Sequence, residues 1–351
     1  MRGCFALIAI HSNIRSVVEK VNFGLSCYSF PFSCGFLKHD GVSACPKPMN
    51  GLDLVDLAVQ YGMTSVEFPH TIIPDHSEAG LDRFRALLQA KGMQYVLDMG
   101  IINVDEMRRV LPLGKRAGAK IVRCTISSFL EGARAKRVPD WDAYMRDMIG
   151  RVVAVQPLLE EHDMLLAIEN HQDAGSADIL ALAQAGGARV GATLDVVNPL
   201  AVAEKPYEFA ERLGDRIFNV HVKDYTIHRT ESGYNLVRAS IGEGCIDWQR
   251  MLTLVRRIAP KAMWHIELAA LNARHIRLYE DQWWRGYPQR DVREMLSLFR
   301  FVAQHTQSDA VAWQTPWERE APAEECEAYE RGQLDRTVTH LKCVLKDLGT
   351  P

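Results

Sequence analysis

Positive charge is not in excess in this sequence. It contains 41 Lys and Arg residues against 44 Asp and Glu residues, which gives a formal net charge of -3. Proteins that bind nucleic acid usually carry a basic domain or a basic stripe. The charge balance therefore excludes a nucleic acid as the expected partner and favours a small neutral or weakly acidic molecule.

Long apolar runs and paired cysteines are also missing. The apolar segment 4–10 is seven residues long, too short to span a membrane, and no convincing cleavage site follows it. We expect residues 1–20 to form a loose N-terminal extension and expect no membrane partner. The eight cysteines are scattered without a C-x-x-C pair. In the absence of an evident secretory leader, this pattern predicts reduced thiols in a cytoplasmic protein.

The composition does provide enough apolar material for a large core. Of the 351 residues, 47% are hydrophobic and 24% are charged, which is typical of a globular protein. The length fits either two small domains or one large α/β barrel, because barrels of roughly 250 residues with insertions form one unit.

A repeated pattern begins at Phe23: a helical stretch, a glycine or polar turn, and a short apolar run that ends in polar residues. Glycines that suit the end of a helix precede most of these runs, at Gly62, Gly92, Gly118, Gly187 and Gly214. The pattern predicts eight strands, over residues 22–28, 65–68, 94–98, 120–125, 164–169, 190–195, 217–222 and 263–268.

Almost continuous apolar runs such as 165–168 indicate strands that are covered on both faces, as in a parallel sheet surrounded by helices. The sequence therefore predicts the α/β class and a (β/α)₈ TIM barrel over residues 21–305. A further helix is expected over 292–304. Residues 306–351 are predicted to form a helical tail of one or two helices, which could provide a homo-oligomer contact.

Four consecutive predicted strands end in side chains that can bind a metal. These are Glu169, Asp195, His221 and Glu267. Taken singly, such a carboxylate could cap a helix and such a histidine could be a core residue. Together they meet at the C-terminal mouth of the barrel, where active sites lie. Oxygen-rich ligation with one imidazole suits one divalent ion, Mn²⁺, Mg²⁺ or Co²⁺, better than structural zinc.

Further polar residues follow the same strands. His171 and Lys223 each lie two residues beyond a candidate ligand, so they can share its face toward the cavity. We expect both to bind substrate and to act in catalysis together with Glu169 and Glu267. The alternatives are a positioning role for His171, and for Lys223 an ion pair with Asp224 or a neighbouring carboxylate.

Weaker candidates come from the early strands and from the region after the last one. Glu67 could accept a substrate hydroxyl group or balance Arg123 inside the barrel. Trp284 belongs to the aromatic stretch 283–288, which is a candidate lid that would contact the substrate, or else a surface or subunit contact. Two further candidates are His70 and Asp98, and the loop 242–248 is expected to be structural.

The last four strands resemble the xylose-isomerase-like barrel superfamily. The resemblance rests on Ala-Ile-Glu169-Asn, Thr-Leu-Asp195, Asn-Val-His221-Val-Lys-Asp and Ile-Glu267, and extends over residues 23–300, although the first four strands match only in pattern. It implies a metal-dependent enzyme of sugar chemistry, since the superfamily holds sugar isomerases, ketose epimerases, lyases and apurinic endonucleases. An endonuclease would need several additional histidines on early strands and a basic face, and neither is apparent.

The resemblance implies a reaction on a small oxo-sugar or sugar acid through an enediolate, whose charge a divalent ion stabilises. Ketose 3-epimerases of the superfamily carry a histidine three residues after the metal-binding Asp and an arginine six after the metal-binding His. Here these positions hold Asn198, which we expect to contact substrate, and Ile227. A positively charged pair, His171 and Lys223, would suit a substrate carboxylate.

The Glu-Asn-His, His-x-Lys-Asp and Trp-Trp-Arg-Gly-Tyr-Pro segments resemble a subgroup that includes 3-oxo-isoapionate decarboxylase. The favoured hypothesis is therefore decarboxylation of a 3-oxo sugar acid to a ketose. The alternatives are a sugar isomerase or epimerase, an eliminase of oxidised glycosides, and a dehydratase, because one barrel scaffold hosts all of these reactions.

Overall fold

The computed structural model of the protein describes residues 23–349. The predicted N-terminal extension, residues 1–20, lies outside the described residues. The same holds for Asn22, the first residue of the first predicted strand, and for Pro351 at the end of the tail.

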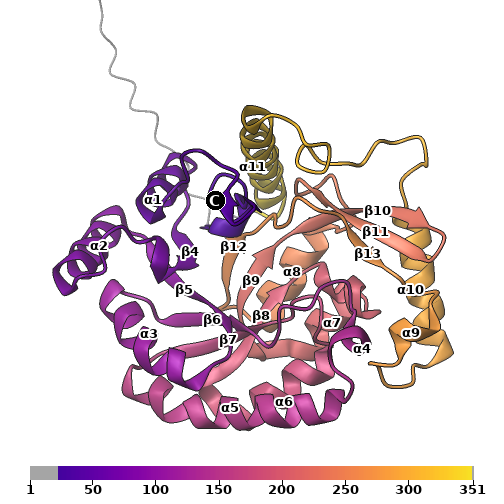
Figure 1. Ribbon diagram of the computed structural model, residues 1–351, viewed down its shortest axis with the longest axis horizontal. Helices are drawn as coiled ribbons and strands as arrows, with labels where there is room; N and C mark the ends of the chain where they lie inside the picture. Colours follow the sequence, from indigo (N-terminus) through magenta and orange to yellow (C-terminus); the bar gives the residue numbers. More distant parts are fainter. Residues whose placement is uncertain (1–22, 350–351) are drawn as a thin grey trace, which may run out of the picture.

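Eight parallel strands form a closed barrel, in the order β1-β12-β9-β8-β7-β6-β5-β4 (Figure 1). This confirms the predicted TIM barrel, and every predicted strand is present. The strands are β1 (Gly24–Ser26), β4 (Ser65–Pro69), β5 (Gln94–Ile101), β6 (Ile121–Thr125), β7 (Leu165–Glu169), β8 (Val190–Asp195), β9 (Ile217–Val222) and β12 (Met263–Ile266).

Helices follow the strands and cover the outside of the barrel (Figure 1). Their apolar faces pack against the outer face of the sheet, as Leu54 and Val55 do in the first helix, and form the main hydrophobic core. The helices of this ring are α1 (Gly51–Gln60), α2 (Glu78–Lys91), α3 (Val104–Ala117), α5 (Trp141–Glu161), α6 (Ser176–Gly186), α7 (Pro206–Leu213) and α8 (Trp248–Ile258).

All five glycines that were expected at helix ends have a positive φ angle. Gly92, with φ of 64°, and Gly118, with φ of 99°, are left-handed residues directly after α2 and α3. Their backbone N–H groups donate to the last carbonyl groups of these helices. A side chain at such a φ angle would be strained, so glycine ends the helix and allows the chain to enter the next strand.

The interior of the barrel is apolar at one level and polar at the next. Val96, Ile121 and Ala167 form a small buried cluster that is separate from the main core. Two residues further along the same strands stand Asp98, Arg123 and Glu169. Since alternate residues of a strand share one face, the apolar cluster fills the barrel below and the charged groups surround its mouth.

A three-stranded sheet beside the mouth was not predicted. It consists of β10 (Asp224–Thr230), β11 (Gly233–Ala239) and β13 (Arg274–Ile276), in the order β10-β11-β13 (Figure 1). The hairpin β10–β11 extends the connection between β9 and α8, and β13 joins it from the connection after β12. A second, smaller hairpin, β2 (Lys38–His39) and β3 (Val42–Ser43), follows β1.

The C-terminal region contains the predicted helix, here α10 (Val292–His305), and one long helix of 25 residues, α11 (Ala323–Asp347). Two short helices, α4 (Arg134–Arg137) and α9 (Asp281–Trp284), lie in loops at the mouth. In α11 the buried Glu330 accepts hydrogen bonds from the backbone N–H groups of Phe32, at 2.8 Å, and Ser33, at 3.0 Å. The tail thereby holds the loop that follows β1.

A search of the described helices finds none with the length and apolar character needed to cross a membrane.

Candidate metal centre

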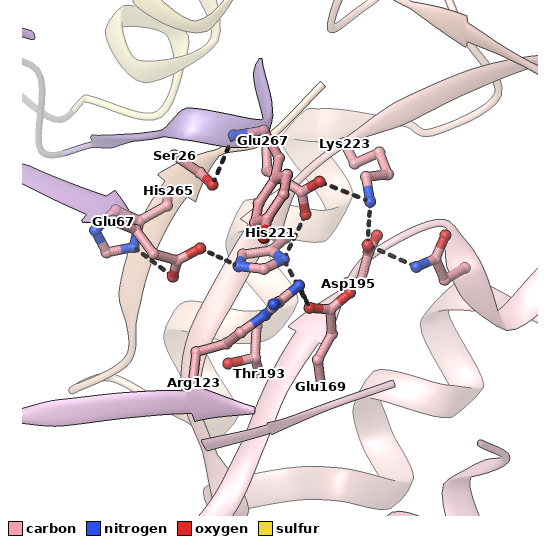
Figure 2. Close-up of polar contacts among 12 residues, drawn as sticks. Ser26, Glu67, Arg123, Glu169, Thr193, Asp195, His221, Lys223, His265 and Glu267 are labelled. Carbon is pink, nitrogen blue, oxygen red and sulfur yellow. Dashed lines mark hydrogen bonds and ion pairs between the residues drawn. The ribbon is translucent and has the colours of Figure 1, made fainter. Parts of the chain in front are cut away.

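The structure brings together the four side chains expected to bind a metal (Figure 2). Each of Glu169, Asp195, His221 and Glu267 is buried and offers one ligand atom, and these atoms all lie within 4.8 Å of one another. The four residues come from four neighbouring strands or strand ends at the mouth of the barrel. The geometry is that of a site that could hold one ion.

Strand register explains this convergence. Asp195 and His221 are lateral partners in β8 and β9, and His221 is the partner of His265 in β12. Glu267, two residues beyond His265, therefore projects on the same side. Glu169 ends β7, beside Thr193 of β8. In this register Asp195 and His221 share a level. Glu169 lies two residues before that level and Glu267 two residues after it, all on one face of the sheet, so their ligand atoms can meet.

Buried polar atoms of all four residues lack an aligned hydrogen bond among the described residues. They include Oε1 of Glu169, Oδ1 of Asp195, Nδ1 of His221 and Oε2 of Glu267. The last two form a close pair, 2.6 Å apart, which leaves Oε1 of Glu169 and Oδ1 of Asp195 without a partner. Because orphaned buried acceptors are costly, a cation at their centre fits the donor set.

The charges around the site also favour a bound cation. Two permanent cations, Arg123 and Lys223, face five buried carboxylates: Glu67, Asp98, Glu169, Asp195 and Glu267. Burial alone would lower the pKa of His221, but Glu67, Glu267 and Glu169 raise it well above its ordinary value. Buried charges need partners, so this excess of negative charge favours a positive ion in the cluster.

Glu67 lies behind His221, away from the substrate cavity. It is fully buried, and its Oε1 lies 2.8 Å from Nε2 of His221 (Figure 2). Its Oε2 accepts from Nδ2 of Asn219 at 2.7 Å. Although burial would raise it, His221 and His265 lower the pKa of Glu67 to about 2. An ionised Glu67 fixes the proton on Nε2, which leaves Nδ1 of His221 for a metal.

This position differs from both expectations for Glu67, which were a substrate contact and a balance for Arg123. Arg123 instead donates to Oδ1 of Asp98 at 2.6 Å. It also forms an ion pair with Glu169 (Figure 2). Asp98 also accepts from the Tyr28 hydroxyl at 3.0 Å. The Arg123 guanidinium thus orients Glu169 from below.

We predict that Glu67→Gln weakens metal binding about 10- to 100-fold, because carboxylates that orient a ligating histidine typically contribute this much. Metal titration followed by calorimetry measures the change. Glu160→Gln, at an exposed position of α5, is the matched control and should leave the affinity unaltered. An unchanged Kd in Glu67→Gln would show that Glu67 does not act through His221.

Lys223 pairs with two carboxylates of the candidate metal site and not with Asp224. Its Nζ contacts Asp195 and lies 3.2 Å from Oε1 of Glu267 (Figure 2). Burial alone would lower the pKa of Lys223, but these two carboxylates raise it above its ordinary value. The ammonium group is therefore charged at neutral pH. It lines the cavity and can donate to a bound molecule there.

Asp224 faces the opposite way and organises the loop 242–248. Its carboxylate accepts from Nε1 of Trp248 at 2.9 Å and from the backbone N–H groups of Cys245, at 2.9 Å, and Ile246, at 3.2 Å. These contacts give the loop the structural role that was expected of it.

His171 lines the cavity as expected, but it does not supply positive charge. Burial lowers its pKa to about 4, so the ring is neutral at neutral pH. Its Nδ1 lies 3.2 Å from the Phe129 carbonyl oxygen, which can only accept, so Nδ1 donates. This pKa does not support the positive charge that was expected of His171 beside Lys223. What remains is a free Nε2 acceptor for a hydroxyl group.

Asn198 also lines the cavity, and its amide nitrogen donates to Oδ2 of Asp195 at 2.6 Å. It is thus placed to orient Asp195 and to touch a substrate. Ile227 is fully buried within β10 and cannot reach one.

The aromatic stretch 283–288 does not line the cavity. Nε1 of Trp284 donates to the Leu278 carbonyl oxygen at 2.8 Å, whereas Nε1 of Trp283 donates to that of Glu131 at 2.9 Å. The Tyr287 hydroxyl donates to Gly132 at 2.8 Å. The stretch therefore supports the loop after β6, and Trp284 is not positioned as a substrate contact. His70, half-buried in a short helix after β4, is likewise absent from the cavity.

The cavity above the candidate ligands has a volume of about 350 Å³. Several of its lining residues were not predicted from the sequence, and Tyr28 and Arg274 are two of them. Tyr28 follows β1, at the same barrel mouth as the residues that were found. Arg274 belongs to β13, and its place depends on the unpredicted sheet, for which the strand-end rule gives no signal.

Comparison with protein families identifies the family of this chain. The model of the xylose isomerase-like TIM barrel matches residues 55–282, which include the candidate ligands. The chain belongs to this family. The resemblance drawn from the last four strands is thereby confirmed.

A curated relative is 3-oxo-isoapionate decarboxylase of Pectobacterium atrosepticum, 23% identical over 237 residues, which cover 66% of this chain and 80% of that protein. Among solved structures, D-psicose 3-epimerase with D-tagatose from Clostridium cellulolyticum H10 has a TM-score of 0.56 at 11% identity, covering 82% of this chain and 99% of its own. The IolI protein with a zinc atom has a TM-score of 0.54 at 14% identity, with the same coverage. These likenesses show a shared fold.

Proposed function

We propose that the protein is a divalent-metal-dependent enzyme that acts on a small oxo-sugar or sugar acid. The observation that carries the proposal is the set of four buried ligand atoms, from Glu169, Asp195, His221 and Glu267, that lie within 4.8 Å of one another. Two of these residues, Glu169 and Glu267, line a cavity of about 350 Å³. A cavity of this size takes a small molecule. Mn²⁺, Mg²⁺ and Co²⁺ are the ions that suit this ligand set.

A divalent ion in this site would stabilise negative charge that develops on oxygens of an oxo-sugar. Lys223 lines the same cavity as a charged donor and stabilises an enediolate oxygen by a hydrogen bond. His171 accepts a hydrogen bond from a substrate hydroxyl group through Nε2. Asn198 orients Asp195 through a hydrogen bond, and Arg123 orients Glu169 through an ion pair.

The specific reaction that we favour is decarboxylation of a 3-oxo sugar acid to a ketose. It is supported by the similarity to 3-oxo-isoapionate decarboxylase over 66% of the chain and by the burial of Ile227. The loss of carbon dioxide needs no base, only an acid that returns a proton to the carbon.

A sugar isomerase or epimerase is the second candidate. The observation that favours it is that two carboxylates, Glu169 and Glu267, both line the cavity. Two such groups could remove a proton from one face of a carbon and return it on the other.

Incubation of the Mn²⁺-loaded enzyme with a panel of 3-oxo sugar acids separates the two reactions. We predict that carbon dioxide is released in step with ketose formation. In D₂O, deuterium should appear at the carbon that lost the carboxyl group, because a protein acid protonates it after exchange with solvent. Gas analysis and NMR spectroscopy of the product measure both quantities, and EDTA-treated enzyme is the control.

Two other outcomes would contradict the decarboxylase assignment. If free ketoses exchange a carbon-bound proton for deuterium at a catalytic rate while no sugar acid loses carbon dioxide, the enzyme is an isomerase or epimerase. If neither class of compound reacts, the proposed function is wrong.

A further inference from the structure

Arg274 differs from the other positively charged residues at the mouth of the barrel. Arg123 is paired with Asp98 and Glu169, and Lys223 is paired with Asp195 and Glu267. Arg274 lines the same cavity, yet its side chain has neither a hydrogen bond nor an ion pair with the described residues, and its Nε is buried without a partner.

Two acidic residues accept from the backbone on either side of Arg274. Glu131 accepts from the N–H of His275 at 3.2 Å and from Arg277 at 3.0 Å, and Glu318 accepts from the N–H of Ala273 at 2.8 Å. Burying a charged guanidinium without a partner costs free energy, so Arg274 is suited to bind an anion from outside the chain.

The unpredicted sheet explains why Arg274 faces the cavity. Arg274 is the lateral partner of Leu236 in β11, and Leu236 is the partner of Ile227 in β10. Side chains of lateral partners project on the same face of a sheet. Ile227 and Leu236 are fully buried on that face, and Arg274, at the end of the row, is the member that reaches the cavity.

We propose that Arg274 binds the carboxylate of a sugar-acid substrate. The planar guanidinium offers parallel N–H donors that match the two oxygens of a carboxylate. The other groups first expected to bind this carboxylate do not offer a pair of parallel donors, because Nδ1 of His171 faces the Phe129 carbonyl oxygen and two of the three N–H groups of Lys223 are directed to carboxylates. The substrate's oxo end then lies toward Glu169 and Glu267, with its carboxylate at Arg274. This assignment rests on the proposed function and narrows its substrate class to acids.

Binding of two matched compounds to the Mn²⁺-loaded protein tests the assignment. 5-Keto-D-gluconate and L-sorbose share one carbon skeleton and differ in a terminal carboxylate against a hydroxymethyl group. Calorimetry should show tighter binding of the acid. Arg274→Met should weaken binding of the acid about 10- to 100-fold and change L-sorbose binding less than about 2-fold, as expected when a charge-assisted bidentate contact is lost.

Two further variants separate charge from geometry and from fold. Arg274→Lys keeps the charge without the fork and should give an intermediate affinity for the acid. Arg229→Met removes an arginine from the same sheet whose side chain is 72% exposed and should behave as the unaltered protein. Thermal melting of every variant shows that each is folded.

The assignment is overturned if the acid binds no more tightly than L-sorbose, including the case in which neither binds, or if Arg274→Met weakens both equally. D-fructose 6-phosphate and D-fructose form a second pair, and a preference for the phosphate that depends on Arg274 would also overturn the carboxylate. The same titrations on EDTA-treated protein test the proposed function separately. If L-sorbose binds equally well with and without the metal, the proposed function is contradicted. The difference in affinity between the acid and L-sorbose tests only the role of Arg274.

Discussion

Replacement of Asp195 or His221 by alanine is expected to abolish binding of the divalent ion. Each change removes one of four ligand atoms that lie within 4.8 Å of one another. Asp195→Ala also leaves Lys223 with Glu267 as its remaining partner, and His221→Ala leaves Glu67 without its imidazole. The rest of the cluster then lacks both the charge and the geometry to retain the ion.

The expected loss of activity is about 1000-fold or more, because a catalytic metal contributes several kcal/mol of transition-state stabilisation. A second readout does not depend on the reaction. A ligand that binds only the folded state raises its stability by about 2.7 kcal/mol at 100 times its Kd, so Mn²⁺ should raise the melting temperature of the unaltered protein. It should not raise that of either variant.

Elemental analysis of protein purified without chelators provides the direct measurement, with one ion per chain expected. The matched controls are Asp215→Ala, in the exposed turn before β9, and His162→Ala, at the end of α5. Both should keep the ion. Full metal content in Asp195→Ala and in His221→Ala would rule out the site formed by these four residues.

The barrel could be predicted from sequence because its signals are local. Gly92 and Gly118 end helices through their own φ angles. The apolar run 165–168 indicates a strand covered on both faces, and it can be recognised without knowing which residues pack against it. The rule that polar residues after parallel strands meet at one mouth then brought together the four candidate ligands. Their place on one face of the sheet follows from strand register.

The roles of individual polar residues were harder to predict because they depend on which side chain lies opposite. Glu67 and His221 are far apart in sequence, and their contact arises from closure of the barrel. The neutral state of His171 arises from burial, which a strand-end position does not indicate. Arg274 was missed because β13 joins a sheet built on a hairpin that lies outside the β/α repeat.

Lys223→Met is expected to lower kcat about 30- to 1000-fold while the metal stays bound. This factor corresponds to a loss of roughly 2–4 kcal/mol of transition-state stabilisation. Lys223 lines the cavity as a charged donor and does not belong to the four candidate ligands. A hydrogen bond to developing negative charge is made in the transition state more than in the ground state. The loss should therefore fall on kcat more than on KM.

The melting temperature of Lys223→Met should depend on the metal, and this dependence separates catalysis from folding. Without an ion, loss of the ammonium group leaves Asp195 and Glu267 buried with less positive charge, so the metal-free variant should melt lower. With the ion bound, its charge compensates both carboxylates, and the variant should melt close to the unaltered holoenzyme. Lys120→Met, at an exposed position before β6, is the control for the substitution itself. A holoenzyme variant that melts much lower yet retains its kcat would make Lys223 a structural residue, because its ion pairs would then support the fold and not the reaction.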